Sequence, residues 1–252
     1  MVLPLFKSHY SLGRSILTLE KKEKQLVNGP DSIIDICLEN QIKDFYLVED
    51  NMGSFLQAYH STKDEDLSFR FGLRITVCQN KEIKNKDSIK TNSKYIIFAK
   101  NVDGYKNLIK IYSDAATEGF YYEPRTDFAT LRRLWDDDSL YLAIPFYDSF
   151  LFKNTFDYGS ECIPEFDFTQ PIFLQESNGL FFDPILKDKI KSFSDGKYEI
   201  QDAKSIYYKN KDDFMAYLTF RCIDKRTTWE MPNLENLHSD EFSFESWKEK
   251  GE

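Results

Sequence analysis

Histidine and cysteine are scarce in this sequence of 252 residues. The three histidines, His9, His60 and His238, lie far apart along the chain. A metal centre that needs several converging imidazoles is disfavoured, because a lone histidine is more often exposed or hydrogen-bonded than a ligand. The four cysteines form no Cys-x-x-Cys pair. Zinc ribbons and disulfide frameworks are therefore not expected, and a reducing cytoplasm fits the composition.

Long apolar runs and phosphate-binding glycine loops are also missing. No apolar run reaches 18 residues, and the N-terminus lacks a basic stretch followed by a long apolar segment, so we expect neither a membrane span nor a signal peptide. Rossmann and Walker loops are absent, which leaves nucleotide binding by those routes unsupported. Basic residues are outnumbered 33 to 42 by acidic ones, for a net charge of −9. Such a surface repels phosphate backbones, so we expect nucleic acid to bind only weakly or indirectly.

Apolar and aromatic residues are plentiful, at 41% and 16%, and they predict a globular protein with a sizeable core. Short apolar runs alternate with segments of helical periodicity. Strands are expected at 44–48, 74–78, 94–99, 139–147 and 170–176. Helices are expected at 31–41, 54–60, 101–119, 127–135, 183–193 and 212–223. This alternation favours a parallel sheet covered by helices, and six or seven such units would close into a barrel.

Helix boundaries follow from capping residues. Asp31, Asp127 and Asp183 are each expected to cap a helix, and Pro184 suits a first helical position because its missing N–H costs nothing there. The polar stretch 80–93 is expected to be a surface loop, and the helix at 101–119 to stop at Gly119.

One segment resembles a known family. Residues 96–131 contain the runs AKN, GYKNL and EGFYY followed by PR, and they resemble the polymerase and histidinol phosphatase (PHP) domain that opens bacterial DNA polymerase III alpha subunits. The resemblance extends to shorter stretches. These are residues 9–12, 47–50, 71–77, 205–233 and 239–246. It covers nearly the whole chain and ends before a polymerase domain would begin, so we expect a stand-alone domain.

The resemblance implies an α/β fold, a distorted seven-stranded (β/α)7 barrel of PHP type. We assign residues 1–230 to the barrel and 231–252 to a C-terminal tail. In the family, the strand ends converge on two or three metal ions held by histidines, acidic residues and sometimes cysteine. Such a cluster polarises a phosphoester and lowers the pKa of a bound water. Some members are 3′–5′ exonucleases, whereas in others the site is degenerate.

The family's ligands are replaced in this sequence. Transferring its motifs onto the chain, with His9 two residues beyond the second ligand, gives ten candidate positions: Leu5, Lys7, His9, Glu49, Asp50, Arg74, Lys94, Tyr147, Ser205 and Tyr207. Leucine has no donor atom, and protonated lysine and arginine repel a cation. We therefore predict no bound metal and no catalytic residue.

A buried ion network is the predicted replacement for the metal cluster. Lys7, Arg74, Lys94 and Tyr207 are expected to fill the old cavity by pairing with Glu49 and Asp50. The leading hypothesis is then a catalytically inactive PHP-like domain that acts as a scaffold or interaction protein in DNA replication. Its expected partners are replication proteins, with no membrane contact, and its expected location is the cytoplasm.

Two other functions remain open. The alternative is a diverged phosphoesterase or 3′–5′ exonuclease in which Glu49, Asp50, Asp148 and Glu176 bind Mg²⁺ or Mn²⁺ through oxygen atoms, with His9 as acid or base. Its weakness is that a fold alone does not confer activity.

A minor option uses the cations differently. Lys7, Arg74 and Lys94 converging at the barrel mouth would form an anion pocket for a phosphate or nucleotide without chemistry.

Overall fold

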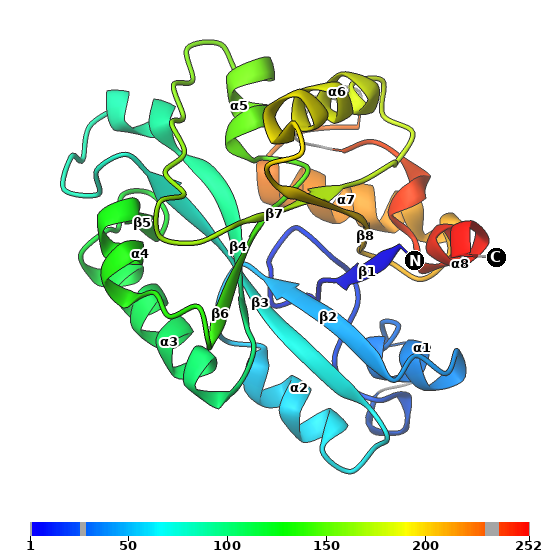
Figure 1. The fold of residues 1–252 in the computed structure, drawn as a ribbon. Coiled ribbons are helices and arrows are strands. Elements are labelled where there is room, and N and C mark those ends of the chain that lie inside the picture. Colours follow the sequence, from blue (N-terminus) through cyan, green and yellow to red (C-terminus); the bar gives the residue numbers. More distant parts are fainter. Residues whose placement is uncertain (1, 26–28, 230–236, 252) are drawn as a thin grey trace.

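The computed structural model describes residues 2–25, 29–229 and 237–251 of the chain. Its strands are β1 Leu3–Phe6, β2 Asp44–Glu49, β3 Ser68–Cys78, β4 Ser93–Ala99, β5 Arg125–Asp127, β6 Leu140–Ile144, β7 Ile172–Gln175 and β8 Glu199–Ile206. Its α-helices are α1 Ile33–Glu39, α2 Phe55–Thr62, α3 Val102–Thr117, α4 Phe128–Leu134, α5 Phe150–Phe156, α6 Asp183–Ser194, α7 Phe214–Lys225 and α8 Phe244–Gly251. The helices surround the strands (Figure 1), so the expected alternation of strand and helix is confirmed.

Seven strands close into a barrel. The circuit runs β1–β2–β3–β4–β6–β7–β8 and returns to β1, while β5 pairs with the end of β3 outside the ring. This confirms the expected seven-stranded α/β barrel. One detail differs from a fully parallel sheet, because β4 is antiparallel to both β3 and β6. The connection from β3 to β4 holds only a short 3-10 helix, Asp87–Thr91, instead of the long crossover that a parallel return requires.

The barrel interior is apolar below and charged at its mouth. Side chains from six strands form a separate buried cluster: Leu5, Val48, Ile96, Phe98, Ala143, Leu174 and Ala203. Gly72 of β3 leaves room for one of them, since a Cβ there would lie 2.6 Å from the Phe98 ring. Because side chains alternate along a strand, residues two positions after Leu5 and Leu174 also point inward. Those residues are Lys7 and Glu176, which line a cavity at the mouth.

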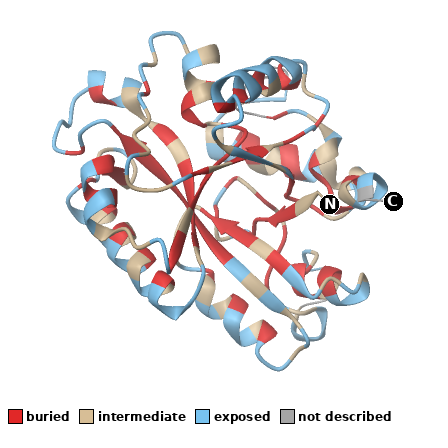
Figure 2. Cartoon of the chain, in the orientation of Figure 1, coloured by how far each residue is buried: buried red, intermediate tan, exposed pale blue. Residues whose placement is uncertain are grey.

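The larger core lies between the barrel and its helices. Buried and exposed residues alternate around the helices, with buried faces toward the strands (Figure 2). In α3 the buried residues include Gly104 and Leu108, whereas Val102 in its first turn is 70% exposed. Gly104 sets the rotation of the helix, because a Cβ there would lie 2.1 Å from the Ser139 carbonyl oxygen.

Capping of the helices agrees with the sequence at one of three positions. Asp127 caps α4 by accepting the Thr130 N–H at 2.8 Å, as expected. At α1 the prediction of Asp31 was wrong, because the Ser32 hydroxyl accepts the Asp35 N–H. Asp183 is the first residue of α6, with Pro184 beside it in the first turn, and its carboxylate accepts backbone N–H groups upstream of the helix.

Residues 237–251 pack against the barrel. Phe244 is buried, and its ring stacks on Phe6 of β1 at 6.2 Å between centroids. The Trp247 indole N–H donates to the Val2 carbonyl oxygen at 3.0 Å. The expected boundary between residues 230 and 231, and the end of the family resemblance at 230–233, lie outside the described residues. Among the helices of the described ranges, none has the length and apolar character to cross a bilayer.

Candidate functional site

The strand ends bring most of the candidate positions together at the barrel mouth. A small cavity of about 40 Å³ lies there, with room for only a few water molecules. Six of the ten candidate positions line it: Leu5, Lys7, Arg74, Tyr147, Ser205 and Tyr207. Arg14, Asp148 and Glu176 also contribute to its polar wall. This part of the barrel mouth is therefore nearly filled by side chains, whereas a more open cavity of about 440 Å³ has Asp50, Arg74 and Lys94 in its wall.

Three cationic side chains surround the carboxylate of Asp50 at this mouth. Its Oδ1 accepts from Lys7 Nζ at 3.0 Å and from Arg74 Nη1 at 3.3 Å, and Arg14 Nε lies 3.9 Å from Oδ2. Burial alone would raise the pKa of Asp50, but these three cations outweigh it and hold that pKa well below its usual range. Pairing of Lys7 and Arg74 with Asp50 follows the sequence expectation.

Arg74 links Asp50 to a second carboxylate, Asp148. Its Nη2 donates to Asp148 Oδ2, and the side chain of Arg74 is only 9% exposed. Burial opposes the charge, but the two carboxylates outweigh it and raise the pKa of Arg74. The guanidinium therefore stays protonated at every physiological pH.

The position of Asp148 depends on its backbone. It follows the Phe146-Tyr147 pair after β6 and has φ +61°, a left-handed conformation that aspartate tolerates better than most residues. Its carbonyl oxygen accepts the Lys94 N–H at 2.8 Å, which ties this loop to the start of β4. Burial alone would raise the pKa of Asp148, but Arg74 and Arg14 lower it. The sequence suggests Asp148 only as a metal ligand; its place directly after the strand expected at 139–147 is the signal that could have identified it as an anchor for Arg74.

Glu49 is fully buried and hydrogen-bonded to serines. Oε1 accepts from the Ser8 N–H at 2.9 Å and from the Ser8 hydroxyl at 2.5 Å, and Oε2 accepts from the Ser11 hydroxyl. Burial raises the pKa of Glu49 to about 7, although Lys7 and the serines oppose this. The prediction that Glu49 pairs with cations was therefore wrong. Its hydrogen-bond partners are Ser8 and Ser11, which the short loop after β1 brings to it.

Lys94 has partners other than those expected from the sequence. Its Nζ donates to Glu123 Oε2 at 2.6 Å and to the Thr76 hydroxyl, so its partner is neither Glu49 nor Asp50. Burial lowers the pKa of Lys94, although Glu123 opposes this. Sequence reasoning missed Glu123, which lies inside the segment of strongest family resemblance.

Glu176 accepts the hydrogen bonds of Ser205 and Asn178 at the ends of β8 and β7. Its carboxylate accepts the Ser205 N–H at 2.9 Å and the Ser205 hydroxyl at 2.8 Å, and the Asn178 amide donates to Oε2 at 2.8 Å. Burial raises the pKa of Glu176. The same amide donates to the Tyr147 hydroxyl, which in turn donates to Asp183 Oδ1 at 3.0 Å.

Tyr207 closes this side of the mouth by ring stacking. Its ring lies 5.2 Å from the Phe242 centroid and 5.6 Å from the Tyr217 centroid. It therefore fills space at the mouth through aromatic contacts with Tyr217 and Phe242, in place of the expected pairing with Glu49 and Asp50.

The histidines do not converge. His9 is exposed, with Nδ1 3.3 Å from the Leu17 carbonyl oxygen. His60 lies on α2 as expected and is exposed, and His238 packs edge-on against Phe214. Within residues 2–25, 29–229 and 237–251, no three or more His, Cys, Asp or Glu side chains are grouped so as to hold a metal ion. The four cysteines are free and buried.

The residues at the mouth do not fit a metal cluster. Leu5 offers no donor, and Lys7 and Arg74 project cationic groups toward the carboxylate of Asp50. That carboxylate and Asp148 already bind the guanidinium. A divalent ion would have to displace a protonated arginine from a poorly hydrated position and leave that charge without partners. We derive no reaction step through a metal at this site.

The barrel and the position of its polar mouth define a class of protein, the PHP-type barrels. Sequence comparison agrees: the model of the PHP domain matches residues 27–156, just over half of the 252 residues, and the chain belongs to the PHP domain family.

The chain is similar to parts of two DNA polymerase III alpha subunits. That of Helicobacter pylori strain J99 is 34% identical over 82 residues, which cover 32% of this chain and 7% of the relative. That of Borreliella burgdorferi strain B31 is 34% identical over 79 residues, which cover 31% of this chain and 7% of the relative. The similarity thus spans only a small part of these longer polymerases.

Proposed function

We propose that this PHP domain is catalytically inactive and serves as an interaction domain in DNA replication. The single observation that carries the proposal is the Arg74 guanidinium, which lies between Asp50 and Asp148 at the barrel mouth. By resemblance, the family's metal ligand from the third strand falls at Arg74. A fixed positive charge there takes up the carboxylates and repels a divalent ion.

The oxygen-only site of the alternative function has little support. Each of its four carboxylates already has partners: Glu49 and Glu176 accept from serines, and Asp50 and Asp148 accept from Arg74. The raised pKa of Glu49 and of Glu176 also weakens them as ligands, since a protonated carboxyl binds metal poorly.

Hydrolysis assays test the inactivity. Purified protein would be incubated with bis-para-nitrophenyl phosphate and with single-stranded DNA, each with Mg²⁺, Mn²⁺ or Zn²⁺. We expect no turnover above the protein-free blank, and the same result for Glu49→Gln. Metal-dependent turnover that Glu49→Gln abolishes would establish the phosphoesterase instead.

Affinity capture tests the interaction role. Similarity to the alpha subunits of two bacterial DNA polymerases III supports a replication protein as partner. The intact chain on a matrix would be exposed to a lysate of its own source, beside a matrix carrying an unrelated protein of similar negative charge. We expect the matrix that carries this chain to enrich an identified replication protein relative to the control matrix. Recovery of no replication protein above the control would contradict this role.

A further inference from the structure

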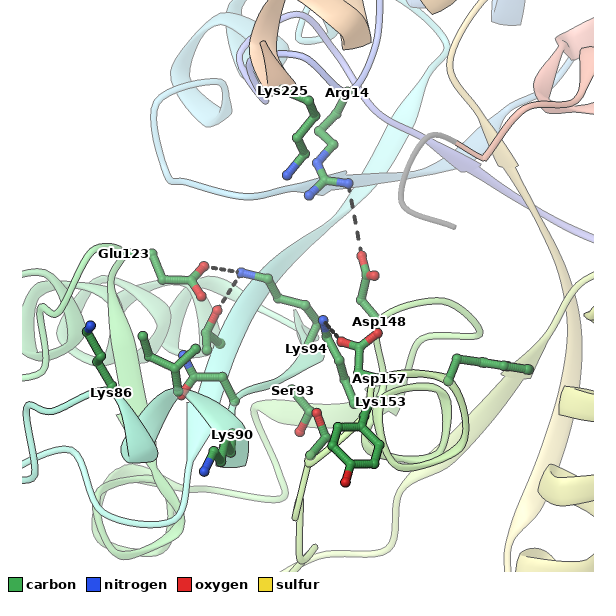
Figure 3. A pocket seen from close by; sticks show the side chains of 16 residues that line it. Arg14, Lys86, Lys90, Ser93, Lys94, Glu123, Asp148, Lys153, Asp157 and Lys225 are labelled. Carbon is green, nitrogen blue, oxygen red and sulfur yellow. Dashed lines mark hydrogen bonds and ion pairs between the residues drawn. The ribbon is translucent and has the colours of Figure 1, made fainter. Parts of the chain in front are cut away.

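A second, larger cavity opens beside the barrel mouth. It has a volume of about 700 Å³, within the range of small-molecule sites. Its wall comes from the loop after β1, the 3-10 helix Asp87–Thr91, the start of β4, α5 with the loop after it, and the end of α7. Figure 3 shows these side chains around the cavity, with Lys86 and Lys90 on one side and Arg14 and Lys225 on another. Segments distant in sequence thus form one wall.

The wall is positively charged in an acidic protein. Its six basic residues are Arg14, Lys86, Lys90, Lys94, Lys153 and Lys225. Its three acidic residues are Glu123, Asp148 and Asp157. The formal charge of the lining residues is six minus three, or +3, and it is +2 when Asp87, which pairs with Lys90 at 2.8 Å, is included, whereas the chain as a whole carries −9. A local excess against the global balance concentrates anions in the cavity.

Several of these cations are poorly hydrated. The side chains of Arg14, Lys94 and Lys153 are 19%, 20% and 23% exposed. Their carboxylate neighbours do not close the cavity: Lys94 pairs with Glu123 at 2.6 Å and Lys153 with Asp157 at 2.5 Å along the wall itself (Figure 3). Partial burial strengthens the attraction of such groups for an anion.

Other side chains add a neutral surface. Phe156 and Ile89 line the cavity together with Tyr158, whose ring is fully exposed. An exposed aromatic ring beside cations suits a ligand that joins phosphate groups to a planar base, because the base stacks on the ring.

We propose that this cavity binds a nucleotide, through phosphate contacts with its lysines and base contacts with Tyr158. The site shares Lys94 with the anion pocket of Lys7, Arg74 and Lys94 expected from the sequence, but Lys7 and Arg74 are not part of its wall and pair with Asp50 and Asp148 instead. Its ligand comes either as a free nucleoside triphosphate or as the end of a single strand. The proposal does not rest on loss of catalysis at the barrel mouth.

Calorimetric titration of the intact chain tests the site, without added metal. The probes are inorganic phosphate, dATP and a 5′-phosphorylated tetrathymidylate. We expect saturable binding of one dATP or one oligonucleotide per chain, tighter than phosphate, and weakening as salt rises. Tighter binding of dATP identifies a free nucleotide as the source, and tighter binding of the oligonucleotide identifies a strand end.

Matched double variants locate the binding. Lys86→Gln/Lys90→Gln removes two exposed lysines from the wall, and we expect about tenfold weaker binding of the preferred probe. Lys106→Gln/Lys110→Gln removes the same charge from an exposed face of α3 and should leave affinity within about twofold. Equal weakening by both variants, or no saturable binding of either nucleotide probe, would overturn the proposal.

Discussion

Arg74 and Asp50 meet at the mouth of the barrel from the neighbouring strands β3 and β2, with guanidinium Nη1 3.3 Å from carboxylate Oδ1. Lys7 Nζ approaches the same oxygen at 3.0 Å, and the second guanidinium nitrogen binds Asp148. Four charges therefore share a site with little access to water. Because Lys7 and Asp50 directly follow β1 and β2, and Arg74 lies within β3, the network belongs to the barrel itself.

Replacing Arg74 should destabilise the fold. Arg74→Met keeps much of the side-chain volume but leaves Asp50 and Asp148 without the shared cation. We expect the free energy of unfolding at pH 7 to fall by roughly 3 kcal/mol, the effect of removing one partner of a buried pair. Urea denaturation followed by circular dichroism measures it.

Arg133→Met is the matched control. Arg133 pairs with Asp114 at 3.4 Å, but its side chain is 61% exposed, so the same substitution should cost no more than about 1 kcal/mol. Equal losses in free energy of unfolding for the two variants would show that the barrel-mouth network stabilises the fold no more than a surface ion pair does.

Protonation of Glu49 should make stability depend on pH. Its pKa is about 7 in the fold, above the ordinary 4.5, so the folded chain holds this proton more tightly than the unfolded chain. The resulting stabilisation is complete below pH 4.5 and is lost as the pH rises through 7. Between pH 5 and 8 this amounts to roughly 2 kcal/mol.

Glu49→Gln isolates that effect, because glutamine resembles the protonated carboxyl and keeps partners for Ser8 and Ser11. From pH 5 to 8, the wild type should lose about 2 kcal/mol more in free energy of unfolding than the variant. The depressed pKa values of Asp50 and Asp148 act at more acidic pH and are present in both proteins. Parallel profiles for the two proteins would contradict a titrating Glu49.

The segment 237–251 should unfold together with the barrel. Phe244 is 4% exposed and stacks on Phe6 of β1, so Phe244→Ala should lower the free energy of unfolding by about 3 kcal/mol. Phe181→Ala removes a ring that is 80% exposed and should have an effect below about 0.5 kcal/mol. A single urea transition with these shifts is expected; an unchanged midpoint for Phe244→Ala would mean that the segment is separate.

The sequence was sufficient for the barrel and for the region of the site. The strands at 44–48 and 94–99 could be predicted because their apolar residues are contiguous. The cap at Asp127 could be predicted because no neighbouring residue is a better hydrogen-bond acceptor. At α1 the adjacent Asp31 and Ser32 compete for the cap, and the sequence does not show which residue has the required backbone geometry.

The pairings at the mouth were only partly predictable. Asp148 and Glu123 reach Arg74 and Lys94 from loops whose positions depend on barrel closure and on a left-handed backbone at residue 148. Glu49 lies one residue before Asp50, yet it faces the serines because consecutive side chains point to opposite sides of a strand. Such partners follow from tertiary geometry, and sequence spacing alone does not encode them.

Metal content tests the central claim most directly. The purified chain would be incubated with Mn²⁺, Fe²⁺ or Zn²⁺, dialysed against metal-free buffer and assayed by mass spectrometry of the elements. With Arg74 and Lys7 holding Asp50, we predict that every metal is removed to far below one ion per chain. One or more ions retained per chain, and lost on Asp50→Asn substitution, would contradict the replacement of the metal cluster by an ion network.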